Sequence, residues 1–137
     1  MFFGVVLFAL LTSRQEIPRP EVSEKVARTA AQQKINSQLL YEIYRRRGEA
    51  EPKGVPSEPT GVRVDADGRV LVDIRTDQTT ALPRLVVRAG GRVLSTSAGD
   101  HSVIARVPIL KLEALAADPS VRFIEPAPQA TPYRDHR

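Results

Sequence analysis

The sequence predicts an α+β domain of the ferredoxin-like, split βαβ type, in which one antiparallel four-stranded sheet carries two helices. The main observation is the hydrophobic period between residues 67 and 127. It switches between two residues, which is typical of strands, and about 3.6 residues, which is typical of helices. The order of these segments is strand, helix, strand, strand, helix, strand, and turn-forming residues separate them. That order is the ferredoxin-like one.

Each element has its own signal. Gly90-Gly91 closes the first helix, the turn Ala98-Gly99-Asp100 joins the two middle strands, and Asp118-Pro119 stops the second helix. These signals predict strands over residues 69–75, 92–97, 101–107 and 121–127, and helices over residues 81–89 and 109–117.

The alternation within the strands assigns side chains to the two faces of the sheet. One face meets the helices and carries Val70, Val72, Ile74, Val103, Ala105, Val107, Val121 and Phe123. The opposite face then carries Leu71, Ile104 and Ile124 among charged side chains. An apolar strip with a charged rim on an open sheet face often marks an interface. The alternative is that the preceding helix folds back over this strip.

The chain before this domain divides into three parts. Residues 1–13 begin with the apolar run MFFGVVLFALL, which is too short to span a bilayer. We interpret it as a signal peptide or an apolar anchor, and expect a secreted or cell-envelope protein that meets a membrane only through this segment, if it is not cleaved. Residues 21–47 predict an amphipathic helix, since they lack Pro and Gly and are followed by Gly48. This helix either docks a partner or covers part of the domain.

Residues 48–66 are rich in Pro and Gly and have no apolar period, so we interpret them as a flexible linker to the domain at 67–127. The last segment, residues 128–137, is expected to be an extended tail. Prolines at positions 126, 128 and 132 prevent this segment from joining a helix or a central strand.

The composition argues against several kinds of function. The chain has no cysteine, which excludes disulfides, thiolate metal sites and a Cys nucleophile. His101 and His136 stand alone, and no metal-ligand, phosphate-loop or nucleophile motif is present. The net charge of +4 comes from basic residues that are mostly spread out, which is unlike a nucleic-acid surface. We therefore expect no enzyme activity, no cofactor, no metal and no nucleic-acid partner.

The stretch VLVDIRTDQTTALPRLVVRAGGRVLSTSAGDHSVIARVPILKLEALAADPSVRFIEPA resembles the N-terminal propeptides of bacterial subtilisin-like serine proteases. The similar features are the helix that ends in Gly-Gly, the hairpin with its ARVP return, and the closing LEALAADPSVRFIEP. The upstream KINSQLLYEIYRRRGEA is also similar to the segment before this module in large exported members. The resemblance covers residues 34–127, and no protease Asp, His or Ser motif accompanies it.

The resemblance implies a function. Such propeptides pack the open face of their sheet on the protease, template its folding, and lay their C-terminal tail in the substrate cleft. Here the strip Leu71, Ile104 and Ile124 would dock, and the tail would bind through Glu125, Pro126, Thr131 and Tyr133. The chain would then be a free-standing inhibitor or chaperone, a truncated protease precursor, or a reused module. The alternative function is an exported ferredoxin-like interaction or regulatory domain with no protease partner.

Overall fold

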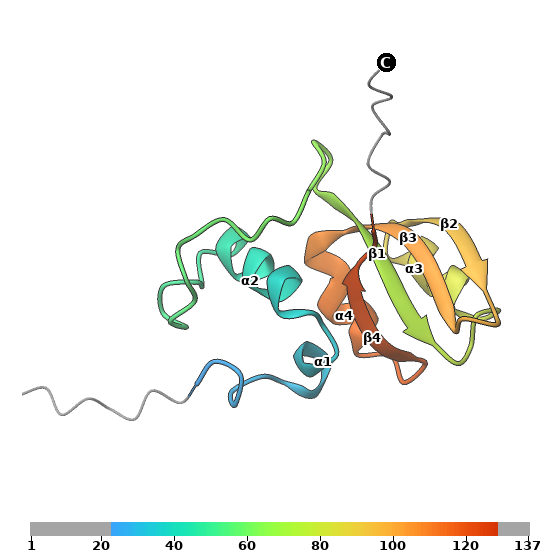
Figure 1. Cartoon of the computed structure of the whole chain (residues 1–137), viewed down its shortest axis with the longest axis horizontal. Helices are drawn as coiled ribbons and strands as arrows, with labels where there is room; N and C mark the ends of the chain where they lie inside the picture. The colour runs from blue at the N-terminus through green and yellow to red at the C-terminus, as the bar shows by residue number, and fades with distance from the viewer. Residues whose placement is uncertain (1–22, 129–137) are drawn as a thin grey trace, which may run out of the picture.

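The sheet in the computed structural model, which describes residues 23–128, confirms the predicted fold class. Four strands pair in the order β2-β3-β1-β4, and every neighbouring pair is antiparallel (Figure 1). The strands are β1 (Arg69–Thr76), β2 (Arg92–Ser97), β3 (Ser102–Pro108) and β4 (Val121–Pro126). This order follows from the two crossover helices of the split βαβ pattern, which place β1 and β3 at the centre of the sheet.

Both crossover helices lie where the sequence predicts them. The first is α3 (Leu82–Arg88), with Pro83 in its first turn, where a missing N–H has no cost. Gly90 ends it with a φ of 83°, a left-handed conformation that favours glycine. The second crossover begins as a 3₁₀ turn, η1 (Ile109–Lys111), and continues as α4 (Leu112–Ala116).

The helices cover one face of the sheet, which we call the inner face. Its side chains from β1 and β3 are fully or almost fully buried: Val70, Val72, Ile74, Val103, Ala105 and Val107. They pack with Leu82, Val86, Ile109, Leu112, Leu115 and Ala116 from the helical crossovers. The core predicted from the hydrophobic periods is confirmed for these elements. Burial of this apolar surface is the main stabilising term of the domain.

The faces of β4 differ from the prediction. Ile124 pairs directly with Ile74 and is 0% exposed, so it lies on the inner face and not on the open one. Phe123 pairs with Arg75 and lies half-buried on the open face instead. The reason is an irregularity in the pairing at Arg75/Thr76, which gives β4 one extra residue. A bulge of this kind reverses the alternation beyond it, so simple alternation assigns the wrong face.

The single helix predicted over residues 21–47 is wrong. The structure has a short helix, α1 (Ala30–Gln33), and a longer one, α2 (Ser37–Arg46). Between them Ile35 forms a parallel bridge to Ile124. The Asn36 N–H donates to the Ile124 carbonyl, and the Ile124 N–H donates to the Lys34 carbonyl, both at 2.8 Å. The helix is interrupted because the peptide groups of Lys34 and Asn36 bond to the edge of β4 that does not pair with β1, and not to a neighbouring turn of helix.

The N-terminal helices lie beside the β4 edge, where α1 contacts α4 and α2 contacts η1 (Figure 1). They do not fold back over the open face of the sheet. The buried side chains of α2 are Leu39, Leu40, Ile43 and Tyr44, which extend the core. Gly48 follows α2, as predicted, and has a φ of 71°.

The segment predicted as a flexible linker is partly attached to the core. Val55 is 8% exposed and belongs to the core cluster. Val64 forms a bridge to Val70. The Pro and Gly residues therefore shape turns in a segment that packs on the domain at both of these valines. The prediction of a free linker is wrong at these positions because isolated valines give no periodic signal.

Candidate functional site

The face of the sheet opposite the helices, which we call the outer face, is the main candidate site. The strand pairing places these side chains on it: Leu71, Asp73, Arg75, Ser102, Ile104, Arg106, Phe123 and Glu125. Leu71 and Ile104 are partly exposed, as expected for a surface that none of the described helices covers. Charged side chains, among them Asp73, Arg75 and Glu125, lie between these apolar ones. The outer face thus combines apolar and charged groups.

A connected set of polar groups runs across the outer face. The Ser102 hydroxyl donates to Asp73 Oδ1 at 2.6 Å, and both residues are buried. Arg75 Nη2 lies 3.2 Å from Asp73 Oδ2 and 3.4 Å from Glu125 Oε1. Its Nη1 donates to the Asp100 carbonyl at 3.2 Å. These bonds fix the Arg75 guanidinium near the end of β1, between Glu125 on β4 and Asp100 in the turn before β3, so the face presents a preorganised charge.

The outer face is hollowed between its polar groups. A shallow depression of about 390 Å³ lies over β1, β2 and β3, and its floor includes Ile104. Pro128, the last residue that the structure describes, lines the same depression. The Ala127 N–H donates to the Leu71 carbonyl at 3.1 Å. The chain therefore leaves β4 along the border of the outer face.

The predicted binding residues fall into four groups. Leu71, Ile104 and Glu125 lie together on the outer face, whereas Ile124 belongs to the core. Pro126 is exposed at the end of β4. Thr131 and Tyr133 lie outside the described residues. Sequence reasoning missed Phe123 on this face and gave no role to the bond between Asp73 and Ser102. Adjacent polar positions on β1 and β3 were the available signal for that bond.

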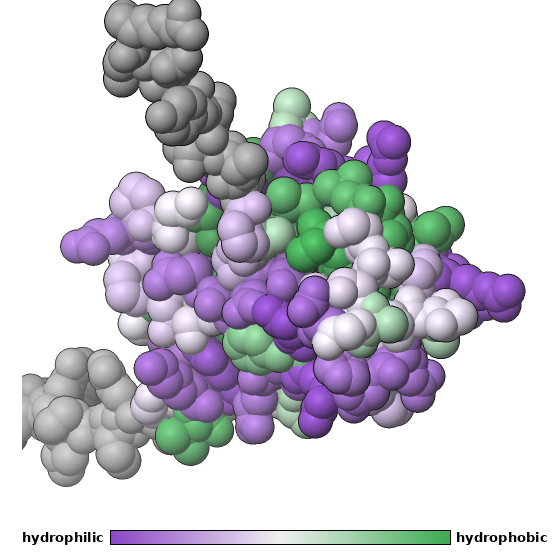
Figure 2. Space-filling view, turned by 45° about the vertical axis from the view of Figure 1, so that its right-hand side comes forward, coloured by the Kyte–Doolittle hydropathy of each residue, from purple (hydrophilic) through white to green (hydrophobic). Residues whose placement is uncertain are grey.

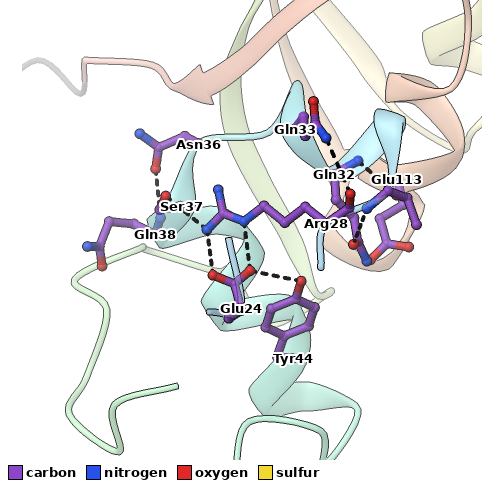
Figure 3. A network of polar contacts seen from close by, with 10 residues as sticks. Glu24, Arg28, Gln32, Gln33, Asn36, Ser37, Gln38, Tyr44 and Glu113 are labelled. Atoms are coloured by element: carbon purple, nitrogen blue, oxygen red, sulfur yellow. Dashed lines mark hydrogen bonds and ion pairs between the residues drawn. The ribbon is translucent and has the colours of Figure 1, made fainter. Parts of the chain in front are cut away.

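A second polar cluster fixes the N-terminal segment to α2 (Figure 3). Arg28 donates to both Glu24 oxygens, at 2.7 and 2.9 Å, and to the Ser37 hydroxyl at 3.1 Å. The Tyr44 hydroxyl donates to Glu24 Oε1 at 3.1 Å. Burial alone would raise the pKa of Glu24, but the hydrogen bonds and charge of Arg28 lower it below its ordinary value. Burial, followed by the charge of Glu24, raises the pKa of Tyr44.

This cluster has the features of a structural contact. Within the described part of the chain, every buried side-chain nitrogen or oxygen has a hydrogen-bond partner. An open pocket of about 640 Å³ lies beside the cluster, lined by Tyr41, Tyr44, Lys53 and neighbouring residues. The Lys53 ammonium lies 4.9 Å from the centre of the Tyr44 ring. The groups that could recognise a ligand therefore already bind one another.

Other features of residues 23–128 that bear on function are possible metal ligands, a histidine with a functional partner and a membrane-spanning helix. No group of three or more His, Asp or Glu side chains there could hold a metal ion. His101 lies in the turn before β3 with its side chain 62% exposed, and its Nδ1 is 3.7 Å from Asp77. No helix in this part of the chain is long and apolar enough to cross a membrane. The apolar segment at residues 1–13 lies outside the described residues.

Comparison with known proteins adds no relative. No family model matches the chain, and neither a curated protein nor a solved structure matches it significantly.

Proposed function

We propose that this chain is a non-catalytic protein that binds a subtilisin-like serine protease, as an inhibitor or a folding chaperone, in the manner of the propeptides it resembles. The supporting observation is the sheet whose outer face is covered by none of the helices in residues 23–128 and whose border Ala127 follows through its hydrogen bond to Leu71. Binding would take place outside the cytoplasm, in the secreted or cell-envelope fraction. The same contacts would operate if the chain is the first part of a longer protease precursor.

The outer face has the composition that such a contact needs. Leu71 and Ile104 supply partly exposed apolar area, and Phe123 adds an aromatic ring on β4. Arg75 and Glu125 lie beside them, held by hydrogen bonds within the sheet. Protein interfaces commonly combine an apolar centre with polar groups of fixed geometry at the rim. The face therefore supports docking of a folded partner more than capture of a small molecule.

The second candidate is a ferredoxin-like interaction or regulatory domain that has no protease partner. The burial of Ile124 favours it, because the outer face then has a smaller aliphatic strip than the sequence predicts. The ion pairs of Arg75 with Asp73 and Glu125 make the same face more polar. A polar face of this kind suits many partners, and fold alone does not choose among them.

The deciding experiment is an inhibition constant for subtilisin-like proteases, measured with the full chain and with a chain that ends at residue 127. We expect the proline-rich tail to be extended, and an extended peptide can add to the edge of a substrate cleft through backbone hydrogen bonds. We expect the full chain to inhibit and the truncated chain to lose most of the inhibition. A serine protease of the chymotrypsin type is the control and should be unaffected.

Each outcome assigns the function. Inhibition that depends on residues 128–137 supports the propeptide-like function with the tail in the cleft. Equal inhibition by both chains removes the tail from the contact and leaves the outer face as the binding surface. If neither chain binds any subtilisin-like protease, the propeptide-like function is wrong and the interaction domain remains.

A further inference from the structure

The two edges of the sheet differ in their backbone pairing. At the β4 edge, Ile35 pairs with Ile124 and is 1% exposed, so the N-terminal segment closes that edge. At the other edge, β2 pairs only with β3 among the described residues. An open edge presents unpaired N–H and C=O groups, which are a template for another strand. The β2 edge is therefore the place where the sheet can be extended.

The sequence of β2 has few of the features that protect natural edges, which are Pro, charged side chains and bulges. Its six residues, RVLSTS, include no Pro and one charged residue, Arg92. Leu94 is 50% exposed and is the extra residue of a bulge, because Val93 pairs with Ala105 and Ser95 with Ile104. Figure 2, in which the β2 and β3 side of Figure 1 is turned forward, shows a hydrophobic area on this side.

Two charges at the ends of this edge have no ionic partner in residues 23–128. Arg92 begins β2, is exposed and forms no ion pair there. Asp100 follows the other end of β2, and its Oδ2 accepts the Ser97 hydroxyl at 2.7 Å, but it too pairs with no cation. The edge is therefore basic at its start and acidic just beyond its end.

We propose that the β2 edge binds a second copy of this chain, through antiparallel pairing of the two β2 strands. A two-fold axis between Leu94 and Ser95 places Arg92 of each copy opposite Ser97 of the other, beside the Asp100 carboxylate. The unpaired charges of one copy then meet those of the second copy with opposite sign. The two exposed Leu94 side chains lie next to each other at the centre, where they bury apolar surface.

This contact is small, and its strength follows from its size. A pair of six-residue strands falls below the roughly 1,200–2,000 Å² that stable interfaces bury, and the bulge at Leu94 weakens the ladder. We therefore expect a reversible dimer that forms only at high concentration. Because β2 is remote from β4 in the strand order, the β1 and β4 part of each outer face and both N-terminal segments stay free. The proposal is thus independent of the proposed protease binding.

Sedimentation velocity of the full chain over a range of concentrations tests the proposal. The variant Leu94→Asp places two carboxylates against each other at the two-fold axis, and we expect it to weaken dimerisation by about tenfold or more. Leu110→Asp is the matched control, since Leu110 is 47% exposed and lies in η1, away from β2. It should dimerise like the parent.

A charge exchange makes the test specific for the register. Arg92→Glu should weaken the dimer by repulsion from Asp100 of the other copy, and adding Asp100→Lys should restore it. A parent chain that stays monomeric at all concentrations overturns the proposal. Self-association that Leu94→Asp leaves unchanged, or that Leu110→Asp reduces equally, also overturns it, because the contact then lies elsewhere.

Discussion

The two faces of the sheet use neighbouring residues of the same strand for opposite purposes. On β1, Val72 and Ile74 point into the inner face and are fully buried among aliphatic side chains. Asp73 lies between them and points to the outer face, where it bonds to Ser102 and Arg75. The inner face thus stabilises the fold through apolar burial, whereas the outer face holds fixed charges and partly exposed aliphatic groups. Substitutions on the inner face should change the stability of the fold, and substitutions on the outer face should change the binding of a partner.

The largest expected effect is on the inner face. Ile124→Ala removes a fully buried side chain that packs at the junction of β4, Ile74 and Ile35, and should lower the free energy of unfolding by about 2–5 kcal/mol. Ile104→Ala removes the same atoms from the partly exposed outer face and should cost well under 2 kcal/mol. Urea denaturation of both variants measures the difference. Equal losses would show that Ile124 is not a core residue.

A smaller effect is expected where the N-terminal segment is fixed to α2. Glu24→Gln weakens its paired hydrogen bonds from Arg28, and should lower the free energy of unfolding by about 1 kcal/mol at neutral pH. The pKa of Glu24 is lowered in the folded protein, so its contribution is complete above the unfolded pKa. The contribution is lost as the pH falls through the folded pKa.

Denaturation of this variant and its parent from neutral to acidic pH tests the expectation. The difference in stability should be greatest at neutral pH and should shrink as the pH falls below about 4.3, the ordinary pKa of a glutamate. Glu58→Gln is the control, because Glu58 is exposed in the segment after α2. A constant difference over the whole pH range would contradict an ionised Glu24 as its source.

The order of elements in the ferredoxin-like part could be predicted because each element has a local signal. The Gly90-Gly91 pair shows this for α3: Gly90 has a positive φ, and a Cβ on Gly91 would lie 2.9 Å from Val86 Cγ1. The face of Ile124 could not be predicted, since the bulge that decides it arises from pairing with β1. Likewise, nothing local in Lys34 to Asn36 indicates that these residues bond to β4.

The candidate site shows the same division. Leu71 and Ile104 were assigned to the outer face correctly because β1 and β3 alternate regularly along their paired length. Phe123 was missed because it lies beyond the bulge. The polar network of Asp73, Ser102 and Arg75 needs two strands in register, so a single sequence gives the residues but not their contacts. Long-range pairing therefore accounts for each difference.

We propose that the outer face contacts a subtilisin-like protease, whereas the inner face stabilises the fold. This proposal is tested by the dissociation constant of a subtilisin-like protease that the parent chain inhibits, measured with Leu71→Asp and Ile104→Asn. Asn is used at Ile104 because Asp there would face Asp73 across the strands. Leu110→Asp, an exposed leucine of η1, is the control. We predict that the dissociation constant rises by about tenfold or more for both outer-face variants, while their unfolding midpoints stay close to that of the parent. Unchanged dissociation constants in both variants would contradict the claim.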